Sequence, residues 1–358
     1  MSALSRRRLS AVLLHQNECL RESILREFAP LAKNAREMPT YSASMAAYKS
    51  ELLSAVDANG ATLQRIFGPP EAGMLSNFKL TLGIGSTGDA YDGLGSIWRH
   101  LAKDWSAQGS GQQATMRERV VTLTRNECMT RQHGSERLRV LVPGCGQGRL
   151  AYTIASALCS SGVEVTGLER SEATLALARH FIEDDGGVNG EPYTFHPFLD
   201  AFTNNWDVAS RCAVLTVPDV PASERQRVRS SGSLILKPDD FLTSRDRGKR
   251  QYDVVVTSFL LDCLSEGIEE GVRAVGDALP PGGLWIFAGP LHYFQGGSYV
   301  PRPSPTLEQV LSLAVDFGME IELPPESISA PYVSRPGAFL PEASWTVPLF
   351  TARKKRTE

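Results

Sequence analysis

Three glycines at alternate positions, Gly144, Gly146 and Gly148, separate a short apolar strand from an apolar helix. Glycine lets the backbone bend sharply there and leaves no Cβ to block a nucleoside cofactor at the carboxyl end of the strand. A dinucleotide fingerprint would need its third glycine at position 149, which is Arg149. The G-x-G-x-G spacing is instead typical of S-adenosylmethionine sites. An ordinary strand-to-helix turn without a ligand is the alternative interpretation.

A carboxylate follows the next apolar strand along the chain. Residues 163–168 are expected to form this strand, and it ends on Glu169. A carboxylate at the tip of the second strand can accept hydrogen bonds from both ribose hydroxyls of a nucleoside. The order of strand, turn, helix, strand and acid therefore favours a cofactor site.

Two residues at the ends of later strands are candidates for catalysis. Asp262 follows the expected strand 252–258, where a carboxylate can hold the N–H of a nucleophile and stabilise the positive charge that forms as it attacks. An N-cap for the next helix is its alternative role. His292 follows the strand 284–288 and can accept a proton or a hydrogen bond, or can simply be a packed residue. Residues 295–303 have a flexible start and a stiff end, as expected of a lid.

An acid and an aromatic residue, Asp240 and Phe241, follow the expected strand 233–237. The acid can accept from the amino group of adenine while the ring covers the face of the base. Alternatively, Asp239 and Asp240 are turn residues after a proline.

The bulk properties exclude several classes of protein. A chain of 358 residues with 42% hydrophobic residues is long enough for about two domains with a sizeable core. The net charge of −3 gives no positive field for nucleic acid. Its six cysteines show no metal-ligand spacing, so no metal is expected, and scattered thiols fit a cytosolic or nuclear protein. The apolar run at 11–14 is too short for a signal peptide or a membrane span.

The hydrophobic pattern changes near residue 135. Residues 1–135 are predicted to form a helical N-terminal extension, because segments at 19–33, 43–56 and 96–105 space apolar residues three and four apart. Residues 136–358 alternate strands and helices, which predicts an α/β domain with a mostly parallel sheet and helices on both faces.

Strands are expected at 138–142, 163–168, 233–237, 252–258, 284–288, 319–323 and 346–352, the last two supplying an antiparallel edge. Helices are expected at 148–161, 171–184, 266–279 and 306–318. The insertion at 186–232 has little periodicity and is expected to be functional or poorly ordered.

Several motifs are distinctive when taken together. They are Arg-His-Leu-Ala-Lys-Asp-Trp-Ser at 99–106, Val-Pro-Gly-Cys-Gly-Gln-Gly-Arg-Leu-Ala at 142–151, Thr-Asn-Asn at 203–205, Pro-Asp-Val at 218–220, Thr-Ser-Phe-Leu-Leu-Asp at 257–262 and Pro-Gly-Gly-Leu-Trp at 281–285. In these motifs the chain resembles the carnosine N-methyltransferase family, a branch of the class I methyltransferases, over roughly residues 97–354. Generic methyltransferases would not share the two motifs inside the insertion.

The resemblance implies a Rossmann-like class I methyltransferase sheet and methyl transfer from S-adenosylmethionine to an imidazole nitrogen of carnosine. It implies cofactor contacts from Gly144, Glu169, Asp240, Phe241, Ser258, His100 and Lys103. At the last two positions the family usually has glutamine and arginine. Lysine keeps the charge for the methionine carboxylate but loses the bidentate fork of arginine, so weaker binding is expected.

The substrate positions match the family less closely. Asp262 matches its substrate-binding aspartate, which by the resemblance would hold the imidazole N–H and leave the other nitrogen aimed at the methyl group. The family's next substrate contact is a histidine, and this chain has Phe294 there. In an extended backbone His292, two residues earlier, points to the same side and can replace it. Trp345 stands near positions where the family has tyrosines. Methyl transfer is therefore better supported than specificity for carnosine.

Three functions follow from these observations. The first is N-methylation of a small-molecule or dipeptide substrate, namely carnosine or a related histidine derivative. The second is methylation of another acceptor, such as a protein histidine or a small amine. The third is a non-catalytic cofactor-binding scaffold, against which the intact glycines, Glu169 and Asp262 argue. No nucleic-acid or membrane partner is expected, and a homodimer is one open oligomeric state.

Overall fold

The structure is a computed structural model in two compact units. It describes residues 3–30, 38–70, 93–131, 137–184, 191–244, 251–293, 304–331 and 345–356. Unit 1 comprises Met1–Gly109, Asp184–Asp219 and Val333–Ala343, and unit 2 comprises Ser110–Glu183, Val220–Tyr332 and Ser344–Glu358. Each unit is described by itself below.

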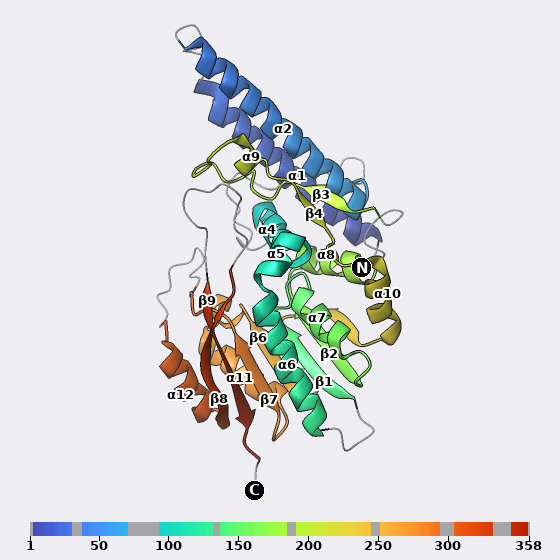
Figure 1. The fold of residues 1–358 in the computed structure, drawn as a ribbon, viewed down its shortest axis with the longest axis vertical. Coiled ribbons are helices and arrows are strands. Elements are labelled where there is room, and N and C mark those ends of the chain that lie inside the picture. The colour runs from blue at the N-terminus through green and yellow to red at the C-terminus, as the bar shows by residue number, and fades with distance from the viewer. Residues whose placement is uncertain are drawn as a thin grey trace. The chain divides into compact units, whose positions relative to one another are not determined.

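A seven-stranded sheet forms the centre of unit 2 (Figure 1). Its strands lie in the order β5-β2-β1-β6-β7-β9-β8, and β9 runs antiparallel to both of its neighbours. The strands are β1 (Leu138–Pro143), β2 (Val163–Glu169), β5 (Leu234–Pro238), β6 (Val254–Ser258), β7 (Leu284–Ala288), β8 (Met319–Ser329) and β9 (Thr346–Lys354). The central strands are almost continuously apolar because helices cover both of their faces.

Helices cover the sheet of unit 2 on its two faces. They are α6 (Ala114–Arg131), α7 (Arg149–Leu158), α8 (Glu172–Ile182), α10 (Ala222–Ser231), α11 (Ile268–Ala278) and α12 (Leu307–Asp316), with a short 3-10 helix, η4 (Leu261–Cys263). In Figure 1, α6 and α7 lie in front of the sheet. Helices α11 and α12 share one core cluster with the sheet residues Val255, Trp285 and Phe350. The sheet is thus held between two helical layers.

The order of the strands reverses between β1 and β6. From β1 the chain proceeds outward through β2 and β5, and then returns to the other side of β1 with β6 and β7. The glycine turn at 144–148, Glu169, the segment 259–262 and the segment 289–293 each follow the carboxyl end of one of these strands. Such a reversal leaves a crevice outside the strand ends, where ligands bind in open α/β sheets.

The predicted α/β fold and Rossmann-like sheet are confirmed. All seven predicted strands and all four predicted helices of the second half are present, including the antiparallel strand near the edge. Strand β8 continues to Ser329, beyond the predicted end at 323, across two irregularities in its pairing with β9. Residues 191–232 of the insertion form β3 (Tyr193–Phe195), α9 (Val208–Arg211), β4 (Leu215–Val217) and α10. Because these elements are formed, the alternative of poor order is wrong for this part. The strands and α9 have only three or four residues each, too few to show a hydrophobic period.

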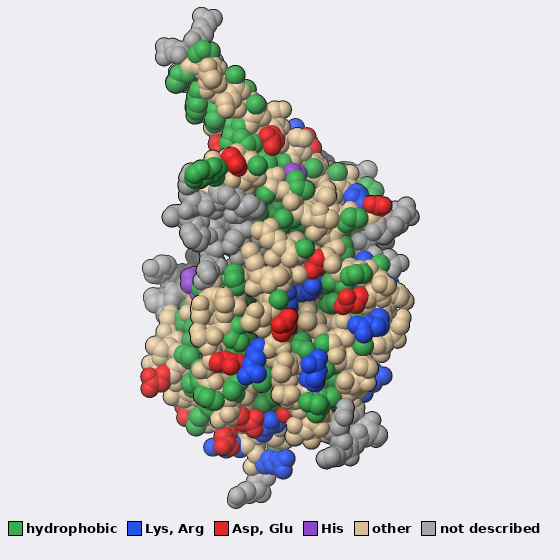
Figure 2. Space-filling view, in the orientation of Figure 1, with side chains coloured by type: hydrophobic (Ala, Val, Ile, Leu, Met, Phe, Trp, Pro, Cys, Tyr) green, Lys and Arg blue, Asp and Glu red, His purple; other side chains and the backbone are tan. Residues whose placement is uncertain are grey.

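Unit 1 is built on a pair of long helices, α1 (Ala3–Phe28) and α2 (Pro39–Phe67), with α4 (Leu94–Trp105) and the β3–β4 pair. The segment of the insertion that belongs to this unit packs on the helices, where Leu199 joins the core of Ile24 and Leu52. The guanidinium of Arg211 donates to both carboxylate oxygens of Glu27, at 2.9 Å each. Figure 2 shows apolar side chains on the outer surface of α1 and α2, and Tyr41 is among the exposed residues there.

The boundary between the two units does not lie near residue 135, where the hydrophobic pattern of the sequence changes. Helix α6 clusters with the sheet because it packs on β7 and β8, and α5 (Ala107–Gln112) spans the change from one unit to the other. Residues 184–219 cluster with the helices because Asn59 and Thr62 of α2 bind the backbone of His196 and Thr194. The part of the insertion up to Asp219 thus completes unit 1, whereas α10 packs on α7 and α8 in unit 2.

Candidate active site

The glycine turn follows β1 with all three glycines in the left-handed region. Gly144 and Gly146 have φ of 58°, and Gly148 has φ of 82° at the N-cap of α7. A Cβ on Gly144 would lie 2.6 Å from Leu260, and one on Gly148 would lie 2.9 Å from Ile182. The missing side chains therefore make room for apolar side chains of the protein itself and bring the turn against the end of β6.

Glu169 is held rigidly at the tip of β2. Its side chain is 3% exposed, and its two oxygens accept backbone N–H groups from Gly146 at 3.0 Å and Ser171 at 2.8 Å. These two hydrogen bonds fix the position and orientation of the carboxylate at the end of β2. The structure therefore joins the acid to the glycine turn, as the sequence predicts, and its predicted binding of ribose stays a prediction.

Asp240 and Phe241 follow β5, where the sequence left two roles open. The Oδ1 atom of Asp240 accepts from the backbone N–H groups of Leu242 and Thr243, at 2.8 and 3.1 Å. The turn role is therefore present. Within the described residues, the other carboxylate oxygen of Asp240, Oδ2, takes no part in the turn, so a hydrogen bond from adenine to this oxygen is compatible with the turn. Phe241 is buried in the core with Leu168.

The ends of β6 and β7 approach each other closely behind the glycine turn. Ser258, paired with Ala288, directs its hydroxyl toward the sulfur of Met116 at 3.9 Å. The next residue, Phe259, has φ of 52°, a strained conformation for a bulky side chain. A Cβ on Gly289 would lie 2.8 Å from the backbone nitrogen of Phe259, so only glycine fits there. Such strain at a strand end often marks a functional site.

Asp262 lies in η4, just beyond β6, with 6% of its surface exposed. One oxygen accepts the backbone N–H of His292 at 3.0 Å, and the other lies 3.7 Å from the sulfur of Cys263. Burial raises the pKa of Asp262, although these hydrogen bonds oppose the rise. The residue does not cap the next helix, because Gly267 is the N-cap of α11. The alternative role as an N-cap is therefore wrong.

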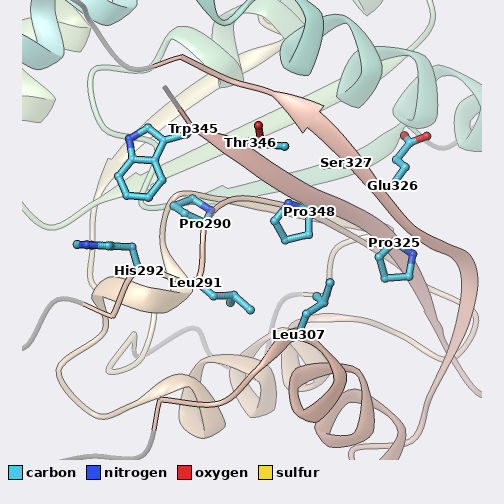
Figure 3. A pocket seen from close by; sticks show the side chains of 10 residues that line it. All are labelled: Pro290, Leu291, His292, Leu307, Pro325, Glu326, Ser327, Trp345, Thr346 and Pro348. Atoms are coloured by element: carbon cyan, nitrogen blue, oxygen red, sulfur yellow. The ribbon is translucent and has the colours of Figure 1, made fainter. Parts of the chain in front are cut away.

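A cavity of about 480 Å³ lies at the same edge of the sheet (Figure 3). His292 and Trp345 form one wall, with ring centroids 5.1 Å apart and planes at 73°. Asp262 is tied to this wall through the backbone of His292. The structure thus brings together three of the predicted substrate residues, while Phe294 lies outside the described residues. The predicted extended backbone at 292–294 also stays a prediction, because Phe294 is not described.

His100 and Lys103 lie on α4 in unit 1. The ammonium group of Lys103 pairs with the carboxylate of the neighbouring Asp104. Burial, together with the positive charges of Lys103 and Arg99, lowers the pKa of His100 to about 4, although the charge of Asp104 opposes the shift. His100 is therefore neutral near pH 7. The predicted cofactor contacts of both residues stay predictions.

Two residues of the site carry no predicted role. The hydroxyl of Tyr293 donates to the carbonyl of Pro305 at 2.7 Å, and burial together with the charge of Asp262 raises its pKa to about 12. Leu260 fills the space beside Gly144. Both residues lie close in sequence to predicted site residues, Tyr293 beside His292 and Leu260 near Asp262. The spacing of the glycines does not indicate which side chain packs on the turn.

Metal-ligand and membrane-spanning patterns were also sought in the described part of the chain. There, no group of three or more His, Cys, Asp or Glu side chains could hold a metal ion. None of the described helices is long and apolar enough to cross a bilayer.

Comparisons with known proteins show the family to which this chain belongs. A family model described as carnosine N-methyltransferase matches residues 86–356. The protein Carnosine N-methyltransferase unmet of Drosophila melanogaster is 26% identical over 244 residues, which are 68% of this chain and 51% of the fly protein. Carnosine N-methyltransferase of Schizosaccharomyces pombe is 27% identical over 245 residues, which are 65% of this chain and 63% of the yeast protein. The chain thus spans 51–63% of the length of these relatives.

Among solved structures, the N-methyltransferase NodS from Bradyrhizobium japonicum WM9 in complex with S-adenosyl-l-homocysteine is similar. The superposition has a TM-score of 0.40 and 13% sequence identity, and it covers 72% of this chain and 96% of that chain.

Proposed function

Because the chain belongs to the carnosine N-methyltransferase family, we propose that it is an S-adenosylmethionine-dependent N-methyltransferase. Its acceptor is an imidazole nitrogen of carnosine or of a related small histidine derivative. One observation carries the proposal: Asp262, a buried carboxylate just beyond β6, accepts the backbone N–H of His292, and the side chains of His292 and Trp345 line the cavity.

The residues at the ends of β1, β2 and β5 fit the cofactor. Glu169 is fixed by two backbone N–H groups at the tip of β2, where its carboxylate can accept hydrogen bonds from the two ribose hydroxyls. Asp240 keeps its second oxygen for the adenine amino group. When bound, S-adenosylmethionine supplies an activated methyl group on a sulfonium.

Asp262 would orient the acceptor. Its carboxylate accepts the N–H of a neutral imidazole, which leaves the lone pair of the other ring nitrogen free to attack. The backbone N–H of His292 holds the carboxylate in place. The rings of His292 and Trp345 offer an aromatic wall on which a flat imidazole can pack. The contribution of these residues is alignment, because in-line displacement needs mainly proximity.

The substitution Asp262→Ala tests this role. We expect kcat/KM for methyl transfer to fall by about a thousandfold, in the range found for groups that act on a reacting proton. Cofactor affinity, measured by calorimetry, should stay within about twofold, because Glu169 and the glycine turn are untouched. Asp316→Ala, at an exposed position at the end of α12, is the matched control and should leave both values unchanged. Retained turnover in Asp262→Ala would rule out the orienting role.

A panel of acceptors decides between the alternatives. Labelled methyl donor is offered with carnosine, histidine, histidyl peptides and small amines, and the products are located by mass spectrometry. Methylation of an imidazole nitrogen supports the proposal, and methylation of a protein histidine or an amine alone supports another acceptor. Cofactor binding with no methyl transfer to any of them would favour a scaffold.

We also propose a cytosolic or nuclear location without a nucleic-acid or membrane partner, and a homodimer as the oligomeric state to be tested first. Scattered cysteines and the net charge of −3 support the location and the absence of nucleic acid. Cell fractionation and light scattering test these points directly.

A further inference from the structure

The cavity next to Asp262 has a composition that does not suit a charged ligand. Six of its lining residues are apolar, namely Pro290, Leu291, Leu307, Pro325, Trp345 and Pro348. They come from the end of β7, the first turn of α12, and the adjoining strands β8 and β9. At about 480 Å³ the cavity is within the range of about 300–1,000 Å³ that is usual for small-molecule sites.

The one charged residue among those that line the cavity is Glu326, and its charge is already engaged. Arg119 of α6 donates to both of its carboxylate oxygens, at 2.5 and 3.4 Å. In Figure 3 the carboxylate of Glu326 points away from Leu291 and Leu307. Within the described lining, the remaining polar side chains are those of His292, Ser327 and Thr346, which are hydroxyls and an imidazole.

This composition conflicts with carnosine, whose β-alanyl end carries an ammonium group. An ammonium placed here would meet only a carboxylate that is already paired with Arg119, whereas an apolar tail gains from contact with prolines, leucines and an indole. We therefore propose that the cavity selects acceptors in which the group on the histidine amine is uncharged and apolar, as in N-acylated histidines. This inference rests on the proposed function, because it assumes that Asp262 holds the imidazole beside His292.

One matched pair of acceptors isolates the charge. Butyryl-histidine has the shape of carnosine with a methyl group in place of the ammonium. The expected result is a kcat/KM at least tenfold higher for butyryl-histidine than for carnosine. Equal or better turnover of carnosine would overturn the inference while leaving the proposed function intact.

A substitution in the cavity wall should change this preference. Leu307 is the first residue of α12 and is half-buried, so a polar side chain there is tolerated by the fold, and a carboxylate suits a helix N-terminus. Leu307→Glu should move the ratio of the two kcat/KM values about tenfold toward carnosine, and the isosteric control Leu307→Gln should move it much less. An unchanged ratio in Leu307→Glu would count against the cavity as the site of the tail.

Binding measurements distinguish a failure of the proposed function from a failure of the inference about the cavity. Calorimetry with S-adenosylmethionine comes first, and a protein that does not bind it lacks the proposed function. If it binds the donor but methylates neither acceptor, both are titrated in the presence of S-adenosylhomocysteine. Tighter binding of butyryl-histidine then supports the inference, and equal or absent binding overturns it.

Discussion

The two edges of the central sheet hold acidic side chains in opposite ways. At the amino edge, the buried carboxylate of Glu127 accepts two hydrogen bonds from Arg353, each of 2.9 Å, and one from Arg131 at 2.6 Å. Arg131 also donates to Asp253 at 2.9 Å. Glu127 and Asp253 are thus both paired with guanidinium groups, which tie α6 to β6 and β9.

At the carboxyl edge, the buried acids are held by neutral donors. Glu169 accepts the N–H groups of Gly146 and Ser171, and Asp262 accepts the N–H of His292 and lies near the thiol of Cys263. These contacts fix the carboxylates but do not cancel their charge. The same residue types thus stabilise the fold at one edge, where guanidinium groups pair with them, and lie at the other edge beside the strand ends where ligands bind in such sheets.

The largest effect is expected at the amino edge. Glu127→Ala should lower the free energy of unfolding by about 3 kcal/mol, because it removes the buried carboxylate that two half-buried arginines share. Urea denaturation followed by circular dichroism measures the loss. Turnover at a temperature where the variant is folded should stay near the wild-type value, since the substitution lies at the far edge of the sheet.

Helix α6 supplies the control for this prediction. Glu118 is exposed on the same helix, so Glu118→Ala should change stability by less than about 0.5 kcal/mol. A similar loss in both variants would mean that removal of any acidic side chain from this helix, and not the loss of the arginine network, explains the effect.

The fold was predictable because its signals are local. Buried parallel strands such as β1 and β6 are continuous apolar runs, and turns with glycine or proline end them. Helix α6 lies in the region predicted as helical but was not identified as a separate segment, because charged residues such as Arg117 and Glu127 lie on its buried face and weaken its apolar period. The strands β3 and β4 have three residues each, too few for any period to show.

The site was predictable only in part, because spacing identifies residues but not their partners. The positions of Gly148, Glu169 and Asp262 follow from strand ends, since parallel strands share one carboxyl edge. The contact of His292 with Trp345 joins residues 53 positions apart and could not be read from either motif. The Asp262 bond to the backbone of His292 likewise depends on how β6 and β7 are paired.

The glycine turn offers the second test of the carboxyl edge. Gly148→Ala should destabilise the fold by about 2 kcal/mol, because alanine disfavours a φ of 82° and its Cβ would lie 2.9 Å from Ile182. Gly232→Ala is a matched control with φ of 60° and nothing within 4 Å of the added Cβ. It should cost about 1 kcal/mol, so the difference between the two variants measures the contact with α8.

Glu169→Gln tests the charge at the same edge. Gln can accept only one of the two backbone N–H groups and offers a donor where the ribose also donates, so cofactor affinity should fall by about tenfold, or about 1.4 kcal/mol. Isothermal titration with S-adenosylmethionine measures the change. Glu172→Gln, exposed in the first turn of α8, should bind the cofactor like the wild type. Equal affinity in all three proteins would remove Glu169 from the cofactor site.

The two edges should also respond to pH with opposite signs. At Glu127 burial acts to raise the pKa, but the hydrogen bonds from Arg353 and Arg131 outweigh it and lower the pKa below its ordinary value. Its contribution to stability is present above the unfolded pKa and is lost as pH falls through the folded one. At Asp262 burial raises the pKa, so its contribution is present below the unfolded pKa and is lost as pH rises through the folded one.

Asp262→Asn should therefore be more stable than the wild type at pH 7, by about 1 kcal/mol, while losing methyl transfer. Its amide oxygen can still accept the N–H of His292, so the substitution removes the buried charge without removing that hydrogen bond. Urea denaturation from pH 7.5 downward should show the advantage shrinking toward the unfolded pKa of an aspartate, about 3.9. A variant that is less stable than the wild type at pH 7 would show that the ionised carboxylate stabilises this edge, as Glu127 does the other.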